Sequence, residues 1–144
     1  MTHGNRTHRI MSLPIVGTAP AAPPRIVAAL CLVASGYLHA QLYLRGYRAI
    51  PGVGPAFLLQ ASGSFAVGVL LLAAAPAILR LAAAGLAGGA LVGFALSRTV
   101  GIFGFVEHGL NPAPQALLSI LTETATLFLL AVPARSDADG AVAA

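Results

Sequence analysis

The stretch PAFLLQASGSFAVGVLLLAAAPAILRLAAAGLAGGALVGFALS, residues 55 to 97, contains a single charged residue, Arg80. About 20 consecutive apolar residues cross a hydrocarbon core of about 30 Å as an α-helix, because only a helix satisfies its own backbone hydrogen bonds in lipid. The stretch is therefore long enough for two spanning helices. We place them near 55 to 74 and 77 to 97, with a tight turn between them.

The rest of the chain extends the same pattern. Of the 144 residues, 58% are hydrophobic and 8% are charged, whereas a soluble domain is about one quarter charged, so the composition excludes a water-soluble globule. Two more apolar stretches predict helices near 25 to 44 and 114 to 132. Prolines favour the first turn of a helix, and one stands at or beside each predicted start: Pro24, Pro55, Pro76 and Pro114.

These helices predict an all-α transmembrane four-helix bundle of antiparallel, up-down topology over residues 25 to 132. The segments 1 to 24 and 133 to 144 lack apolar periodicity, and we expect them to be disordered tails. Arginines mark the cytoplasmic ends of spanning helices. The side that holds both tails has more of them, which predicts cytoplasmic termini in a bacterial plasma membrane: Arg6, Arg9, Arg25, Arg80 and Arg135, against Arg45, Arg48 and Arg98.

The arginines and the cysteine argue against nucleic-acid binding and against cysteine-based disulfides or metal sites. The arginines are scattered between apolar blocks and form no basic face, so we expect no nucleic-acid partner. The one cysteine, Cys31, can support neither a disulfide framework nor a cysteine-based metal site within one chain. Membrane lipids are the partners that the composition implies.

Glycines recur at four-residue spacing in the third predicted helix, at Gly85, Gly89 and Gly93. Small residues on one stripe allow close helix approach in lipid. We interpret the row as helix packing within the bundle. A homo-oligomer or a larger membrane complex, held through the same stripe, is the alternative.

Glu123 is the most informative residue of the sequence, because it lies about halfway along the fourth predicted helix. A charged carboxylate at mid-bilayer costs roughly 2.5 to 3.5 kcal/mol, so Glu123 is expected to face the interior of the bundle, either neutral or paired. Other polar residues share its helix face at steps of three and four: Gln115, Ser119, Thr122 and Thr126.

Polar residues of the other helices fall at a similar depth. His39 and Gln60 lie roughly 8 to 9 Å below the outer boundary at 1.5 Å per residue, and Arg98 ends the third helix on that side. We therefore predict a polar pocket, open toward the outer loops, lined by these residues and Glu123. In a structural role, Glu123 pairs with Arg98 or bonds to His39 or Gln60. In a functional role, the pocket binds a ligand or relays protons.

Three further features bear on chemistry. Arg45, Tyr47 and Arg48 cluster at one predicted interface, where they anchor the helix ends or contact anionic headgroups. His39 and His108 could ligate haem or a metal, but they lack the spacing of such motifs, so we predict neither a metal nor a cofactor. No nucleophile, metal cluster or acid–base pair of an enzyme is recognisable.

Three runs of sequence carry a resemblance: Gly36-Tyr37-Leu38-His39, then Gly46-Tyr47-Arg48-Ala49-Ile50-Pro51 continuing through Gly54 to Phe57-Leu58-Leu59-Gln60, and Ser97-Arg98-Thr99-Val100-Gly101-Ile102-Phe103-Gly104-Phe105. With these runs the chain resembles a family of small, uncharacterised four-helix integral membrane proteins of actinobacteria, over roughly residues 25 to 132. The resemblance implies a plasma-membrane protein and supplies no activity.

The sequence thus favours an accessory or ligand-binding membrane subunit with its pocket at the outer face. A transporter or proton-relay subunit using Glu123 is the first alternative. A membrane enzyme that handles lipids or quinones is the second.

Overall fold

The computed structural model describes residues 24 to 132, and the expected tails lie outside these residues except for Pro24. The described part of the chain is all-α. It consists of the helices α1 (Pro24–Leu44), α2 (Val53–Ala73), α3 (Ala77–Arg98) and α4 (Gln115–Ala131), with a short 3₁₀ helix, η1 (Tyr47–Ala49). Each helix begins and ends within two residues of its predicted position.

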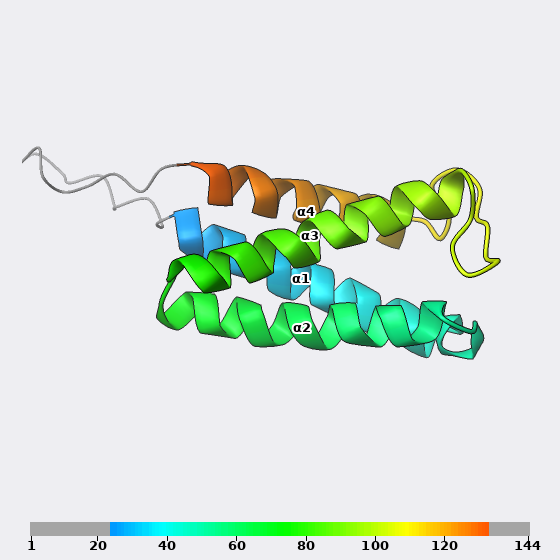
Figure 1. The fold of residues 1–144 in the computed structure, drawn as a ribbon, viewed down its shortest axis with the longest axis horizontal. Coiled ribbons are helices and arrows are strands. Elements are labelled where there is room, and N and C mark those ends of the chain that lie inside the picture. Colours follow the sequence, from blue (N-terminus) through cyan, green and yellow to red (C-terminus); the bar gives the residue numbers. More distant parts are fainter. Residues whose placement is uncertain (1–23, 133–144) are drawn as a thin grey trace, which may run out of the picture.

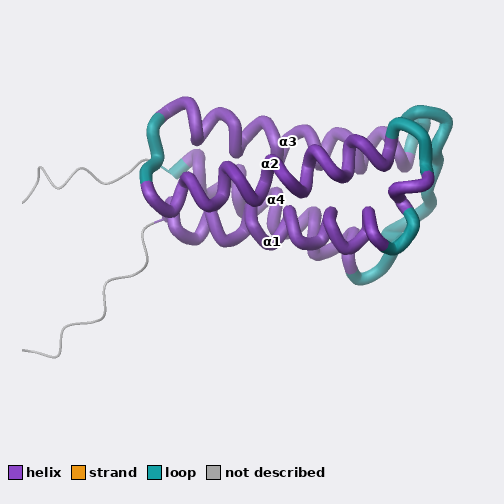
Figure 2. Tube along the Cα trace, turned by 90° about the horizontal axis from the view of Figure 1, so that it is seen from below, coloured by secondary structure: helices purple, strands orange, loops and turns teal. Residues whose placement is uncertain are grey.

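The helices lie side by side and alternate in direction along the chain (Figure 1). The start of α1, the turn between α2 and α3 and the end of α4 share one end of the bundle, called here the terminal end. The segments 45 to 52 and 99 to 114 close the opposite end, called the loop end (Figure 2).

The lengths of the helices differ in a way that matters for membrane crossing. By length and composition, α1, α2 and α3 are each long and apolar enough to cross a membrane. The 17 residues of α4 are apolar as well, and they extend about 25 Å at 1.5 Å per residue.

Close packing in this bundle is concentrated between α1 and α2. A Cβ atom on Gly36 would lie 3.0 Å from Cβ of Ser64, and one on Gly68 would lie 2.6 Å from Cγ2 of Val33. The absence of side chains at these two glycines therefore sets how closely the helices approach, as small residues do in membrane bundles.

The terminal end holds the apolar core. Ala29, Leu32, Leu71 and Ala83 are fully buried and form one cluster. Nearby, Arg80 Nη2 donates to the carbonyl oxygen of Leu130 at 2.6 Å, which satisfies an acceptor that the end of α4 leaves unpaired.

The glycine row of α3 does not pack as the sequence led us to expect. Nothing lies within 4 Å of a Cβ atom built on Gly85, Gly89 or Gly93, nor on the neighbouring Gly88. The prediction of close packing within the bundle at this row is therefore wrong. The row leaves space beside α3 instead of drawing another described helix toward it.

Candidate functional site

Glu123 faces the interior of the bundle, where its side chain is 2% exposed. Its Oε1 atom accepts a hydrogen bond from Ser119, one turn earlier on α4, at 2.7 Å. The same atom accepts a second bond from Ser35 of α1 at 3.0 Å. A buried carboxyl group requires such donors, and this pair of bonds ties α1 to α4.

His39 lies one turn beyond Ser35 on α1 and is 9% exposed. Its Nδ1 donates to the carbonyl oxygen of Ser35 at 2.9 Å. A neutral imidazole has one donor and one acceptor nitrogen, so this bond leaves Nε2 as the acceptor. Nε2 lies 3.9 Å from Oε1 of Glu123, which is too far for a hydrogen bond, and these two acceptor atoms attract each other only when one of them carries a proton.

Gln60 contributes to the same region from α2 but does not bond to Glu123. Its amide nitrogen donates to the carbonyl oxygen of Leu86 at 3.2 Å and to Oγ of Ser64 at 3.4 Å. The first of these bonds links α2 to α3.

Arg98 pairs with Glu107 instead of Glu123, with Nη1 at 2.9 Å from Oε2. Nη1 also donates to Oγ of Ser97 at 2.6 Å. The other donors hold the loop, since Nε donates to the carbonyl of Gly109 at 2.8 Å and Nη2 to that of Asn111. Of the partners predicted for Glu123, Arg98 and Gln60 are thus engaged elsewhere, and His39 is the one nearby.

Tyr47 turns toward aromatic residues of α2 and of the loop between α3 and α4. Its ring stacks on Phe57 at 4.8 Å and meets the edge of Phe105 at 5.9 Å between ring centroids. Its hydroxyl donates to Glu107, so Tyr47 contacts the same carboxyl group as Arg98 at the loop end. Burial first, and then the Glu107 contact, raise the pKa of Tyr47 well above its usual value.

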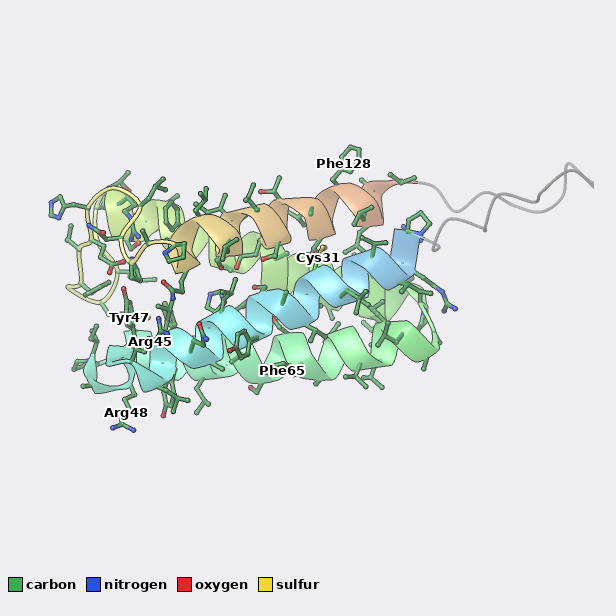
Figure 3. The ribbon with its side chains drawn as sticks, turned by 180° about the vertical axis from the view of Figure 1, so that it is seen from behind. Cys31, Arg45, Tyr47, Arg48, Phe65 and Phe128 are labelled. Carbon is green, nitrogen blue, oxygen red and sulfur yellow. The ribbon has the colours of Figure 1, made fainter. Side chains whose placement is uncertain are left out.

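Arg45 and Arg48, the two arginines predicted to anchor beside Tyr47, are exposed. Figure 3 shows Arg48 pointing away from the bundle, whereas Tyr47 points toward the loop of residues 99 to 114.

These polar groups border a cavity of about 550 Å³. Its walls come from all four helices and from the loop between α3 and α4, and they are mostly apolar. All four residues predicted to line a pocket border it: His39, Gln60, Arg98 and Glu123. Both the volume and a mostly apolar lining with a few polar groups are typical of small-molecule sites.

From the exposure of the lining residues, we infer that the cavity opens between α2 and α3. Every lining residue that is exposed belongs to one of these two helices, namely Ala56, Leu59, Gly85 and Gly89. The loop residues in the lining are half-buried and cover the loop end: Ile102, Phe105, Glu107 and Pro112. The loop that carries the Arg98–Glu107 ion pair thus forms part of the cavity wall at the end where the sequence led us to expect an opening.

The residues predicted for the pocket do not include Glu107, Ser35 or Tyr47. Ser35 carries a signal, because it precedes His39 by four residues and so shares its helix face. Glu107 and Tyr47 carry none, because loop conformation decides which side chains they meet. His108, the other histidine considered for a metal, is exposed in the loop. Among residues 24 to 132, no three His, Cys, Asp or Glu residues form a group that could hold a metal ion.

Comparisons of the chain with models of protein families, with curated proteins and with solved structures gave no match. The site must therefore be interpreted from its own geometry.

Proposed function

We propose that this protein is a four-span integral protein of the bacterial plasma membrane, with both termini cytoplasmic, that binds a small, mostly apolar molecule in the cavity lined by all four helices. It acts as an accessory or ligand-binding subunit. The apolar exposed surface of α4, including Leu121 and Phe128, supports a fourth crossing.

One observation carries this proposal: a cavity of about 550 Å³ reaches the buried carboxyl group of Glu123. A bundle that needs only stability fills such a space, because each void forfeits van der Waals contact and destabilises the fold. Here the glycines of α3 keep the space free, and they do so beside the polar groups that could orient a ligand.

The experiment compares molecules that copurify with the protein and with a variant whose cavity is filled. Gly93 lines the cavity and has nothing within 4 Å of a built Cβ, so Gly93→Phe places a ring in the space. Gly88 is equally uncrowded but does not line the cavity, which makes Gly88→Phe the matched control.

Solvent extracts of each purified protein are compared by mass spectrometry. We expect one compound that is enriched with the wild type and with Gly88→Phe, and depleted with Gly93→Phe. Equal extracts from all three proteins, matching bulk membrane lipid, would refute a ligand-binding cavity.

A second function, proton relay during transport, is favoured by the arrangement of His39 and Glu123. The Nδ1 atom of His39 is engaged by Ser35, so the acceptor Nε2 faces the carboxyl group at 3.9 Å. A small movement would let the two groups share one proton.

Reconstituted vesicles test this alternative through a pH-driven flux. Loss of flux in Glu123→Gln, with the thermal stability of the wild type retained, would support a relay. The matched variant Glu107→Gln alters the other described glutamate and should retain flux. Equal flux in the wild type and Glu123→Gln would remove the alternative.

A further inference from the structure

The two ends of the cavity differ in chemistry. His39, Gln60 and Glu123 stand at the middle of the bundle. The α3 wall carries alanines, glycines and one leucine from Gly93 back to Ala82, over about 17 Å at 1.5 Å per residue, and Gln60 meets this wall near its middle, at the carbonyl oxygen of Leu86. The exposed members of that wall, Gly85 and Gly89, border the mouth. An elongated apolar group fits along this wall, with a polar head inside the bundle.

The charges that face the cavity do not favour an anionic head. The donors of Arg98 are directed to Glu107, Ser97 and two loop carbonyls. Glu107 is paired by Arg98 and also accepts from Tyr47. The remaining titratable groups in the lining are His39 and Glu123, and a carboxyl group at the head position, neutral or ionised, supplies no positive charge to hold a phosphate or carboxylate.

In the lining, His39 and Gln60 each have an acceptor atom with no hydrogen-bond partner among the described residues. His39 is nine-tenths buried, and its Nε2 has no hydrogen-bond partner among the described residues. Gln60 uses its amide nitrogen within the protein, and no described donor reaches its carbonyl oxygen. Among the described residues, no fully buried polar side-chain atom lacks a partner, so these acceptors are accessible atoms, and a ligand that donates a hydrogen bond would satisfy them in the mostly apolar cavity.

We propose that the cavity binds a neutral lipid with a hydroxyl head and one hydrocarbon tail, which enters sideways from the bilayer between α2 and α3. The hydroxyl donates to His39 or Gln60, and the tail follows the glycines of α3. This inference rests on the proposed ligand-binding function and specifies the chemistry of its ligand.

Matched probes test the head group, because they share one tail. Farnesol is neutral and donates a hydrogen bond, farnesyl methyl ether is neutral without a donor, and farnesyl phosphate is anionic. Each is titrated against the full chain in phosphatidylcholine nanodiscs, and dissociation constants follow from the rise in thermal stability, since a ligand stabilises by RT ln(1 + [L]/Kd).

We expect farnesol to bind at least tenfold more tightly than either of the other probes. Gly89→Leu narrows the mouth and should weaken farnesol binding at least tenfold, whereas Gly88→Leu, outside the lining, should leave it unchanged. Neither glycine has a neighbour within 4 Å of a built Cβ, so both variants should fold.

The head position is tested by His39→Phe and Gln60→Leu, at least one of which should abolish the preference for farnesol over its ether. Tighter binding of farnesyl phosphate would overturn the neutral head and leave the ligand-binding cavity in place. Equal affinity for the three probes, unaffected by Gly89→Leu, would overturn the proposal, because it reports partition into the bilayer alone. A copurifying compound that lacks a hydroxyl group would also overturn it while supporting the proposed function.

Discussion

The hydrogen bond from Ser119 to Glu123 gives a stability prediction that can be worked from the structure. Glu123→Leu removes the acceptor shared by Ser119 and Ser35, but it also removes a polar group from the membrane interior. The first effect destabilises and the second stabilises. The stability of the single variant therefore does not reveal the bond, and a double-mutant cycle is required.

In the cycle, Ser119→Ala is measured in the wild type and in Glu123→Leu. Hydrogen bonds between membrane helices contribute about 0.6 kcal/mol on average and at most about 1.7 kcal/mol. We place the coupling energy in this range, toward its upper part, because the bond is short at 2.7 Å and the acceptor is buried. In Glu123→Gln an oxygen acceptor is retained, so Ser119→Ala should again be destabilising.

The assay is reversible unfolding in mixed micelles with increasing denaturing detergent. Ser62→Ala is the control for hydroxyl removal, because Ser62 is exposed and donates to the backbone of its own helix. Its coupling to Glu123→Leu should be zero within error. Zero coupling for Ser119 as well would refute the buried network.

Three further predictions follow from other contacts. Gly68→Leu should destabilise the bundle by about 1 to 3 kcal/mol, because its Cβ meets Val33 at 2.6 Å; unfolding that matches Gly88→Leu would contradict this. Arg98→Lys removes the fork that holds the loop, so hydrogen exchange of loop amides should quicken at least tenfold, unlike in Arg48→Lys. Because the pKa of Tyr47 is raised, the stability that its contacts contribute is complete below about pH 10 and is lost as the pH rises through the pKa of the folded state. Tyr47 should therefore stay protonated near pH 10, where the wild type and Tyr47→Phe should show the same tyrosinate absorbance. A higher tyrosinate absorbance in the wild type would contradict this prediction.

The helices could be predicted because lipid imposes a simple rule. Charge gaps and prolines mark where an apolar helix begins and ends, and backbone satisfaction leaves no other structure for these stretches. The inward position of Glu123 follows from the same physics, since its exposure to lipid is costly.

The contacts of the loop end could not be predicted. Arg98 meets Glu107 because the loop of residues 99 to 114 folds back over α3, and no periodicity in the sequence records that fold. The glycine row of α3 shows a related limit. Its spacing places Gly85, Gly89 and Gly93 on one stripe, but spacing does not tell whether a helix or a space lies beside it. In this structure it is a space.

The most direct test of the account is a distance measured by solid-state NMR in lipid bilayers, between Nε2 of His39 and the carboxyl carbon of Glu123. The protein is labelled at histidine and glutamate, and the Glu107→Gln variant leaves one described glutamate to observe. We predict a clear dipolar contact that disappears in His39→Phe, as the 3.9 Å separation of Nε2 and Oε1 requires. A Glu123 carboxyl group that shows no contact with His39, and couples instead to lipid acyl chains, would contradict the account.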